Sequence, residues 1–424
     1  MRSAALRHTL LLDMLSSIRV VDTAAVAELD ASDWVAIKAT VKSHRLAPLL
    51  HWQLQHHHAD LAIPPDFKAY LEASYKQSTL RALELQRELT LVHRILEQAG
   101  IPYLALKGSF LAYHSYPKAA LRPLRDLDLL IHKSRVLDAY QAALDGGLKR
   151  VAEYPGDPLS FMKLSQHLPP LRSASERANV EIHAQLLNPN MIVLDQPDAL
   201  EETLLWERSI TRTMGTETLR FLSPTDLLLH LIVHAVDHHQ FDNGPLILSD
   251  IAWLLQSEPI DWPGFWKSAA AGDWLKSCVL AFKMTERYWG PQPIQWHEVA
   301  PLNDPSLPAI VEAASLLMLR DYESRGDTRL TQMLTDKASL SERLRFIAQK
   351  IFPSRVSISA LYGKKADSPF IYLDYPRKWW SLLSSRLPNM LNVQSSPDSQ
   401  AETTRLSQVQ HWIHGNHKPH HHHH

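Results

Sequence analysis

Hydrophobic residues in the first hundred positions recur every three or four residues, which is the spacing of one helical face. The clearest face carries five apolar residues on successive helical turns: Leu85, Leu89, Val92, Leu96 and Ala99. Gly100 follows directly and is typical of a helix end. We therefore predict a helical N-terminal region over residues 1–99.

The spacing changes after Gly100. Short apolar runs bounded by turn residues predict strands, at residues 101–108, 126–131, 167–173 and 179–186. Helical patterns lie between them at 109–116 and 134–147, the second with Ser134 as N-cap and Gly146-Gly147 as its end. These runs predict a small mixed α/β unit over about residues 100–190, and we place the core domain at 100–215.

Helical spacing returns at Ser223, where Ser-Pro-Thr-Asp forms a typical helix start. Strong helical patterns follow at 227–239 and 246–255, and we predict a C-terminal helical domain over residues 216–387. Residues 388–424 are polar and predict a flexible tail, which ends in five histidines that we interpret as a purification tag. The predicted fold is therefore α+β, with a small mixed sheet flanked by helical regions.

Composition narrows the class of protein. Of 424 residues, 45% are hydrophobic and 21% are charged, which is typical of globular chains. The formal net charge of −1 gives no global basic field for nucleic acid or anionic membrane. The single cysteine, Cys278, excludes an internal disulfide and a multi-cysteine metal site. The apolar stretch near the N-terminus is interrupted by Asp13, and no apolar run is long enough for a bilayer. We expect a cytoplasmic protein with no membrane partner.

The run 126–131 places two aspartates in an otherwise apolar strand. Side chains alternate between the two faces of a strand. Asp126 and Asp128 therefore share one face, and Leu127, Leu129 and Ile131 share the other. Two buried carboxylates without partners would cost several kcal/mol each. The acidic face therefore either holds a cation or is solvated, with ion pairs to Arg122 or Arg125.

Two further patterns favour the cation. Lys107-Gly108-Ser109 leads from a predicted strand into a helix, a turn whose backbone N–H groups suit a phosphate. On the later run 179–186, Glu181 and His183 share one face. Three carboxylates beside a phosphate-binding turn are suited to hold two divalent ions for in-line attack at phosphorus.

In this order, these motifs resemble the nucleotidyltransferase superfamily of the DNA polymerase β type. More narrowly, the chain resembles the bacterial uncharacterised nucleotidyltransferase family, in which Lys-Gly, Arg-Pro, Asp-x-Asp and acid-x-His elements follow one another. The resemblance covers about residues 40–385 and is most specific over 104–131 and 180–186. Glu181 stands where many members of the superfamily carry Asp, which keeps the charge on a longer side chain.

The resemblance implies transfer of a nucleoside monophosphate from an NTP, with ATP among the expected nucleotides, to an acceptor hydroxyl with two Mg²⁺ ions. Asp126 and Asp128 would bridge the Mg²⁺ ions on the triphosphate. Glu181 would complete the metal site nearest the acceptor and help to deprotonate its hydroxyl.

The resemblance also implies a nucleotide-binding set. Gly108 and Ser109 would hold the β- and γ-phosphates, and Lys107 and Arg122 would neutralise phosphate charge. For the two cations, ion pairs with the acidic cluster are the alternative. His183 would orient Glu181 or contact the substrate, or it is a structural histidine.

The acceptor is left open. The near-neutral charge favours a small molecule, a peptide or a protein over nucleic acid. A transfer RNA acceptor, as in nucleotidyltransferase-type toxins, needs only one basic groove and is an alternative. A non-catalytic nucleotide-binding scaffold is the alternative from another class, although a scaffold has little need of the third carboxylate.

His230, His234 and His238 lie four residues apart and form a stripe on one helical face. With Asp250 opposite them, they suit either a zinc or manganese site or a structural role. We favour the structural role, in which His234 is a core histidine that is hydrogen-bonded to Asp250.

Overall fold

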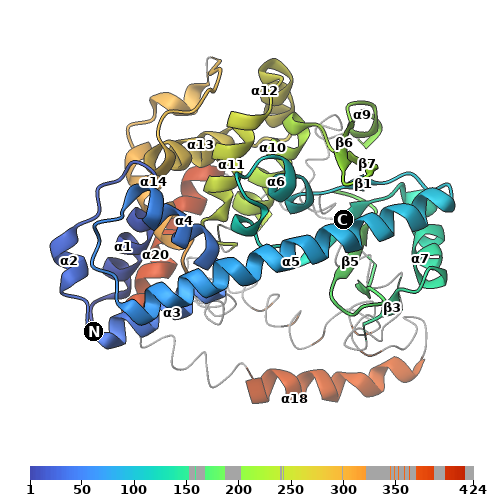
Figure 1. Cartoon of the computed structure of the whole chain (residues 1–424), viewed down its shortest axis with the longest axis horizontal. Coiled ribbons are helices and arrows are strands. Elements are labelled where there is room, and N and C mark those ends of the chain that lie inside the picture. Colours follow the sequence, from blue (N-terminus) through green and yellow to red (C-terminus); the bar gives the residue numbers. More distant parts are fainter. Residues whose placement is uncertain are drawn as a thin grey trace.

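The computed structural model describes most of the chain, namely residues 1–151, 168–186, 202–238, 243–297, 299–320, 369–385 and 397–415, with single residues between these ranges. Within the described part, a mixed seven-stranded sheet lies beside a large body of helices (Figure 1). This arrangement confirms the predicted α+β class.

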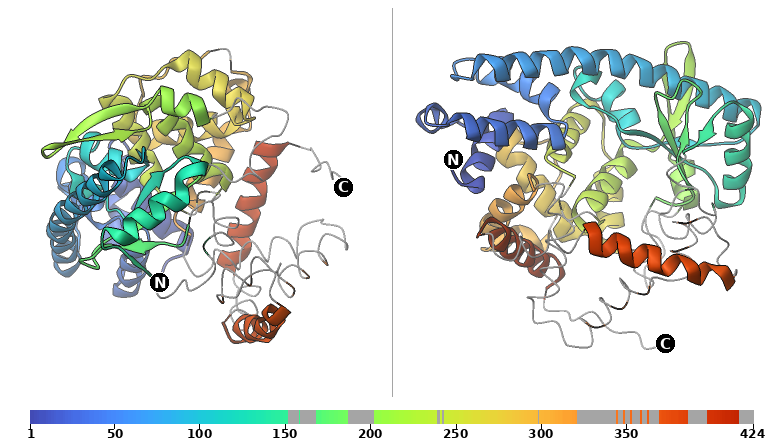
Figure 2. Two further views of the ribbon diagram at one scale, coloured as in Figure 1. Left: turned by 90° about the vertical axis from the view of Figure 1, so that its right-hand side faces the viewer. Right: turned by 90° about the horizontal axis from the view of Figure 1, so that it is seen from below.

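The N-terminal region is helical. It consists of α1 (Ala4–Leu15), α2 (Thr23–Ala27), α3 (Ala31–Ser43), α4 (Ala47–His57) and α5 (Pro65–Gln98). Figure 1 and the right-hand view of Figure 2 show α5 running along the molecule from the helical body to the sheet. Four of the five predicted face residues of its last turns are buried, whereas Ala99 is exposed beside Gly100.

The sheet has the strand order β3-β4-β5-β2-β1-β7-β6. Its strands are β1 (Leu104–Ala105), β2 (Asp126–Leu130), β3 (Lys149–Arg150), β4 (Leu171–Arg172), β5 (Asn179–His183), β6 (Ile210–Met214) and β7 (Glu217–Phe221). The central pair, β2 and β5, is parallel, and β1 runs antiparallel to β2 and parallel to β7. Helices α6 (Gly108–His114) and α7 (Val136–Asp145) connect the strands and cover the sheet.

Two local predictions about this region need correction. The hairpin β6–β7 was not predicted, although Gly215 at φ +63° makes a two-residue turn between alternating Thr-rich strands, a typical hairpin signal. It places β7 beyond the predicted core boundary at residue 215. Ser134 is not the N-cap of α7, because it lies inside the short 3₁₀ turn Lys133–Arg135, and α7 begins after Arg135 without a side-chain cap.

The part of the C-terminal region that the structure describes is mostly helical. It contains α9 (Glu202–Glu207), α10 (Pro224–Val233), a π-helix (His234–His238), α11 (Leu246–Ser257), α12 (Trp262–Ala271), α13 (Leu275–Trp289), α14 (Leu307–Leu317), α18 (Tyr375–Ser385) and α20 (Pro397–His414). Short 3₁₀ turns occur at Ala119–Leu121, Ala300–Asn303 and Pro369–Asp374. Ser223 caps α10 as predicted, because its side chain accepts a hydrogen bond from the Asp226 N–H. None of the described helices combines the length and apolar character needed to cross a bilayer.

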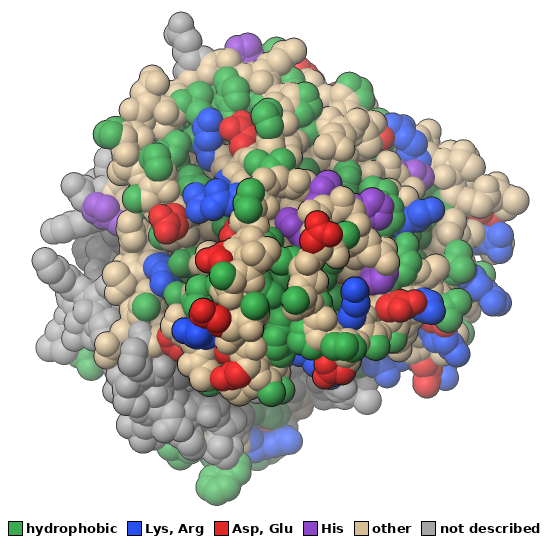
Figure 3. All heavy atoms as spheres, turned by 60° about the vertical axis from the view of Figure 1, so that its left-hand side comes forward, with side chains coloured by type: hydrophobic (Ala, Val, Ile, Leu, Met, Phe, Trp, Pro, Cys, Tyr) green, Lys and Arg blue, Asp and Glu red, His purple; other side chains and the backbone are tan. Residues whose placement is uncertain are grey.

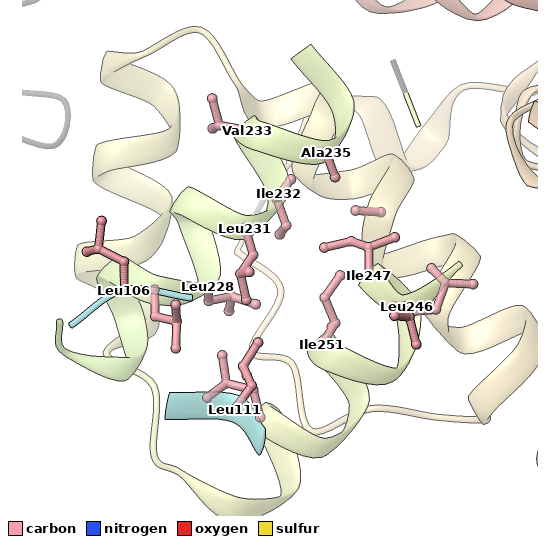
Figure 4. Packing of buried hydrophobic residues seen from close by; sticks show 14 of the residues in the cluster. Leu106, Leu111, Leu228, Leu231, Ile232, Val233, Ala235, Leu246, Ile247 and Ile251 are labelled. Carbon is pink, nitrogen blue, oxygen red and sulfur yellow. The ribbon is translucent and has the colours of Figure 1, made fainter. Parts of the chain in front are cut away.

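One hydrophobic core joins the sheet to these helices. Leu106 precedes the turn before α6, and Leu111 lies within α6. In Figure 4 both lie against Leu228 of α10 and Ile251 of α11. All four are at most 2% exposed. Packing against the helical body therefore holds the turn after β1 in place.

The predicted flexible tail is wrong over residues 397–414. There α20 packs on α14, with Leu406, Val409 and Trp412 buried. The indole Nε1 of Trp412 donates a hydrogen bond of 2.8 Å to Asp304. The remainder of the predicted tail, including the terminal histidines, lies outside the described residues, apart from Gly415.

Candidate active site

The parallel pairing of β2 with β5 brings the acidic residues together. In its register, Asp126 is paired with Asn179 and Asp128 with Glu181. The alternate β2 residues, Leu127 and Leu129, are at most 1% exposed and pack on the other face. The two acidic stretches therefore meet on one half-open face of the sheet, because every second side chain of both strands points to it.

His183 lies between two of these carboxylates. Its Nε2 atom is 2.9 Å from Oδ1 of Asp128 and 3.6 Å from Oε2 of Glu181. The three side chains each offer a ligand atom, and these atoms all lie within 4.8 Å of one another. Asp126, two residues earlier on β2, is not a member of this group. The sequence could indicate that Glu181 and His183 share a face, but not that His183 contacts Asp128.

The carboxylates have opposite electrostatic environments. Burial, followed by the charges of Glu181 and Asp128, raises the pKa of Asp126 to about 6. Burial also acts to raise the pKa of Asp128, but Lys107 and the hydrogen-bonded His183 outweigh it and hold that pKa below its ordinary value. Burial acts to lower the pKa of His183, yet its hydrogen bonds with Asp128 and Glu181 raise it overall. The carboxylates of the site therefore repel one another at Asp126, whereas Lys107 and His183 stabilise the charge on Asp128.

The predicted phosphate turn lies beside this group. The backbone N–H of Leu106 donates to the carbonyl of Asp128 at 2.9 Å, so the turn that follows begins next to the second aspartate. Lys107 has φ +52°, and α6 begins at Gly108. A Cβ atom on Gly108 would lie 2.3 Å from Cδ2 of Leu124, so any larger residue there would require the Leu124 side chain to move. Ser109 is buried, and its contact with phosphate stays a prediction.

Arg122 has a different partner from the acidic cluster. Its Nε and Nη2 atoms donate to the two oxygens of Asp250 on α11 at 2.8 and 3.1 Å, and its Nη1 donates to the Pro123 carbonyl at 3.2 Å. Tyr116 donates its hydroxyl proton to the same Asp250 carboxylate. The alternative in which Arg122 pairs with Asp126 or Asp128 is therefore wrong. Its contact with a nucleotide stays a prediction.

The pairing of Arg122 with Asp250 bears on the predicted role of the histidine stripe. Because Arg122 and Tyr116 hold Asp250, the predicted hydrogen bond from His234 to Asp250 is wrong. Burial, with a smaller contribution from Lys107, lowers the pKa of His230 to about 3, and its ring lies 5.9 Å from that of His234. Among the described residues, the groups of three converging metal ligands include neither histidine.

Asn179 and Tyr116 belong to the surroundings of the site and were not predicted. A side-chain hydrogen bond from Asn179 opposes the rise in the pKa of Asp126. Strand alternation would have placed Asn179 on the acidic face, two residues before Glu181. Tyr116 carried no sequence signal, since its partner Asp250 is 134 residues away in the chain.

The residues fit a divalent cation, because two carboxylate oxygens and an imidazole nitrogen converge within 4.8 Å of one another. With the mixed sheet and the turn before α6, this is the arrangement of a nucleotidyltransferase. The chain belongs to the uncharacterised nucleotidyltransferase family, whose model matches residues 30–290. That range contains all seven strands and every residue of the predicted site. No curated protein and no solved structure matches the chain.

Proposed function

We propose that this protein transfers a nucleoside monophosphate from an NTP to an acceptor hydroxyl, with release of pyrophosphate. The observation that supports it best is the pairing of Asp128 with Glu181 in the β2–β5 register, with Asp126 on the same face. Divalent ions, Mg²⁺ in the first instance, would neutralise phosphate charge and make the acceptor hydroxyl easier to deprotonate.

The nucleotide side of the site has three contributors. Asp126 and Asp128 hold the cations and thereby orient the triphosphate. Within the described chain, Lys107 makes no ion pair, so its ammonium group is available to a phosphate oxygen although its charge already acts on Asp128. The N–H groups at Gly108 and Ser109, the first two residues of α6, are assigned to the β- and γ-phosphates.

The acceptor side is assigned to Glu181. It lies on β5, a different strand from the aspartates, and its side chain is 19% exposed. A carboxylate in this position can accept the proton of an attacking hydroxyl once that hydroxyl is held near the phosphorus. This role distinguishes an enzyme from a nucleotide-binding scaffold, which would need only the nucleotide side.

The proposed acceptor is a small molecule, a peptide or a protein in the cytoplasm. Basic and acidic side chains are interspersed on the face drawn in Figure 3, which is consistent with the net charge of −1. A long nucleic acid would favour a continuous basic surface.

The test uses the four NTPs, each labelled at the α-phosphate, with the small-molecule, RNA and protein fractions of a cell lysate. We expect label from one nucleotide to enter one fraction with the wild-type protein and not with Asp128→Asn. Circular dichroism should show that the variant is folded. If the wild-type protein labels no fraction with any nucleotide, in Mg²⁺ or in Mn²⁺, the proposed transfer is wrong. Label in the RNA fraction would support the transfer RNA alternative.

A further inference from the structure

His183 occupies a position among the carboxylates that suits a metal ligand. Its Nε2 atom faces Oδ1 of Asp128 and Oε2 of Glu181, and all three groups are held by the same pair of hydrogen-bonded strands. The three-carboxylate set implied by the family resemblance contains no histidine, and it contains Asp126, which is absent from this group of three.

The distances agree with shared coordination. Ligands at about 2.1 Å from a cation and at right angles to each other lie about 3 Å apart. The observed separations from Nε2, 2.9 and 3.6 Å, lie on either side of this value. A cation could therefore replace the proton between imidazole and carboxylates after small side-chain rotations, without moving either strand.

The donor set carries information about the metal. Mg²⁺ prefers oxygen ligands and retains several waters, whereas imidazole nitrogen is a good ligand for first-row transition metals. Two carboxylates with one imidazole form a mixed set that Mn²⁺ accepts readily. Lys107 lies near enough to influence both Asp128 and His183, so a ligand stronger than water would help to retain a cation beside it.

We propose that His183 is a ligand, with Asp128 and Glu181, of the acceptor-side cation, and that this position selects Mn²⁺ over Mg²⁺. The term acceptor-side rests on the proposed function, but the coordination does not. Asp126 remains outside this position and serves the cation that accompanies the nucleotide. The competing interpretation is that His183 only donates a structural hydrogen bond to Asp128.

The test is pulsed EPR of Mn²⁺ bound to the full chain without nucleotide. We expect the hyperfine coupling of a directly bound nitrogen, and we expect its pattern to change when the protein is labelled with ¹⁵N-histidine. The coupling should disappear in His183→Gln, with Mn²⁺ affinity at least about tenfold weaker. Mg²⁺ affinity, measured by competition, should change by less than about threefold. His132→Gln, two positions beyond the end of β2, is the matched control and should behave as wild type.

Two results would overturn the assignment. One is oxygen-only coordination of Mn²⁺ in the wild-type protein, a result that needs no variant and so does not depend on how His183→Gln folds. The other is an equal loss of Mn²⁺ and Mg²⁺ affinity in a folded variant. Nitrogen coordination without any NMP transfer would contradict the proposed function and leave this inference intact. NMP transfer with oxygen-only coordination would do the reverse.

Discussion

Two acidic groups in this protein differ in composition and in how their charges are paired. In one, Asp250 accepts two hydrogen bonds from Arg122 and one from Tyr116. In the other, Asp128 and Glu181 face His183, with Asp126 on the same face of the sheet and Lys107 nearby. We call the first group balanced, because one guanidinium faces one carboxylate, and the second unbalanced, because burial and the charges of Glu181 and Asp128 raise the pKa of Asp126.

We interpret the Asp250 group as structural and the group on β2 and β5 as a binding site. Buried polar groups that serve the fold are normally satisfied within it. A buried group with excess charge destabilises the fold unless a ligand completes it, and such groups concentrate at functional sites. The predictions below test whether the two groups respond to mutation as this distinction requires.

The largest effect should come from the balanced group. Asp250→Asn leaves the Arg122 guanidinium buried without a counter-charge, and we expect the free energy of unfolding to fall by about 3–5 kcal/mol. Asp128→Asn should cost less in the metal-free protein, because the loss of its contacts with His183 and Lys107 is partly offset by relief of repulsion among the carboxylates. Urea unfolding in EDTA measures both. Equal losses in the two variants would show that the two groups do not differ in kind.

The next effect tests the division within the unbalanced group. Glu181→Gln should keep NTP affinity within a few-fold of wild type while NMP transfer falls by at least about a hundredfold, because general-base assistance contributes about 10² to 10⁴ in rate. Equilibrium binding and single-turnover transfer measure the two quantities separately. Transfer at the wild-type rate would mean that the third carboxylate is not Glu181.

A smaller effect concerns pH. The pKa of Asp126 is about 6 in the folded protein and about 3.9 in an unfolded chain, so the folded state binds this proton more tightly. Its contribution to stability is complete below pH 4 and is lost as pH rises through 6. In EDTA, Asp126→Asn should raise Tm at pH 7 by a few degrees and have little effect at pH 4. A Tm difference that does not depend on pH would contradict this account.

The smallest effect should come from the histidine stripe. His234 is half-buried, its ring is near that of His230, and Asp250 is bound elsewhere. His234→Ala should therefore cost about 1 kcal/mol, because it leaves a small, partly buried cavity. Elemental analysis of protein purified without its terminal histidines should find no stoichiometric transition metal that the variant loses. Such a metal would restore the metal interpretation of the stripe.

The sequence predicted what depends on local periodicity. Alternation along β2 and β5 correctly assigned Asp126, Asp128 and Glu181 to polar faces, because a period of two is a property of each strand alone. Pairing is not local. The contact of His183 with Asp128 spans 55 residues, and that of Arg122 with Asp250 spans 128. Neither could be read from a single sequence.

The errors have the same origin. A segment with few large apolar residues predicted a flexible tail. In the structure α20 packs on α14, and three of its apolar residues are buried. The hairpin β6–β7 was obscured by its Thr-rich strands, of which β6 has only one buried residue. In both places tertiary packing, rather than local pattern, determines the structure.

The position of β7 bears on how this protein could have been assembled. Ala105 of β1 is paired with Phe221 of β7. The strand next to β1 on the side away from β2 therefore comes from beyond the predicted end of the core. Arg122 is likewise neutralised from α11, deep in the helical region. A gene fragment ending before residue 217 would encode a sheet with an open edge and a buried unbalanced arginine. We therefore expect the sheet and the helical region to fold as one unit, so that a shortened chain would have to keep both.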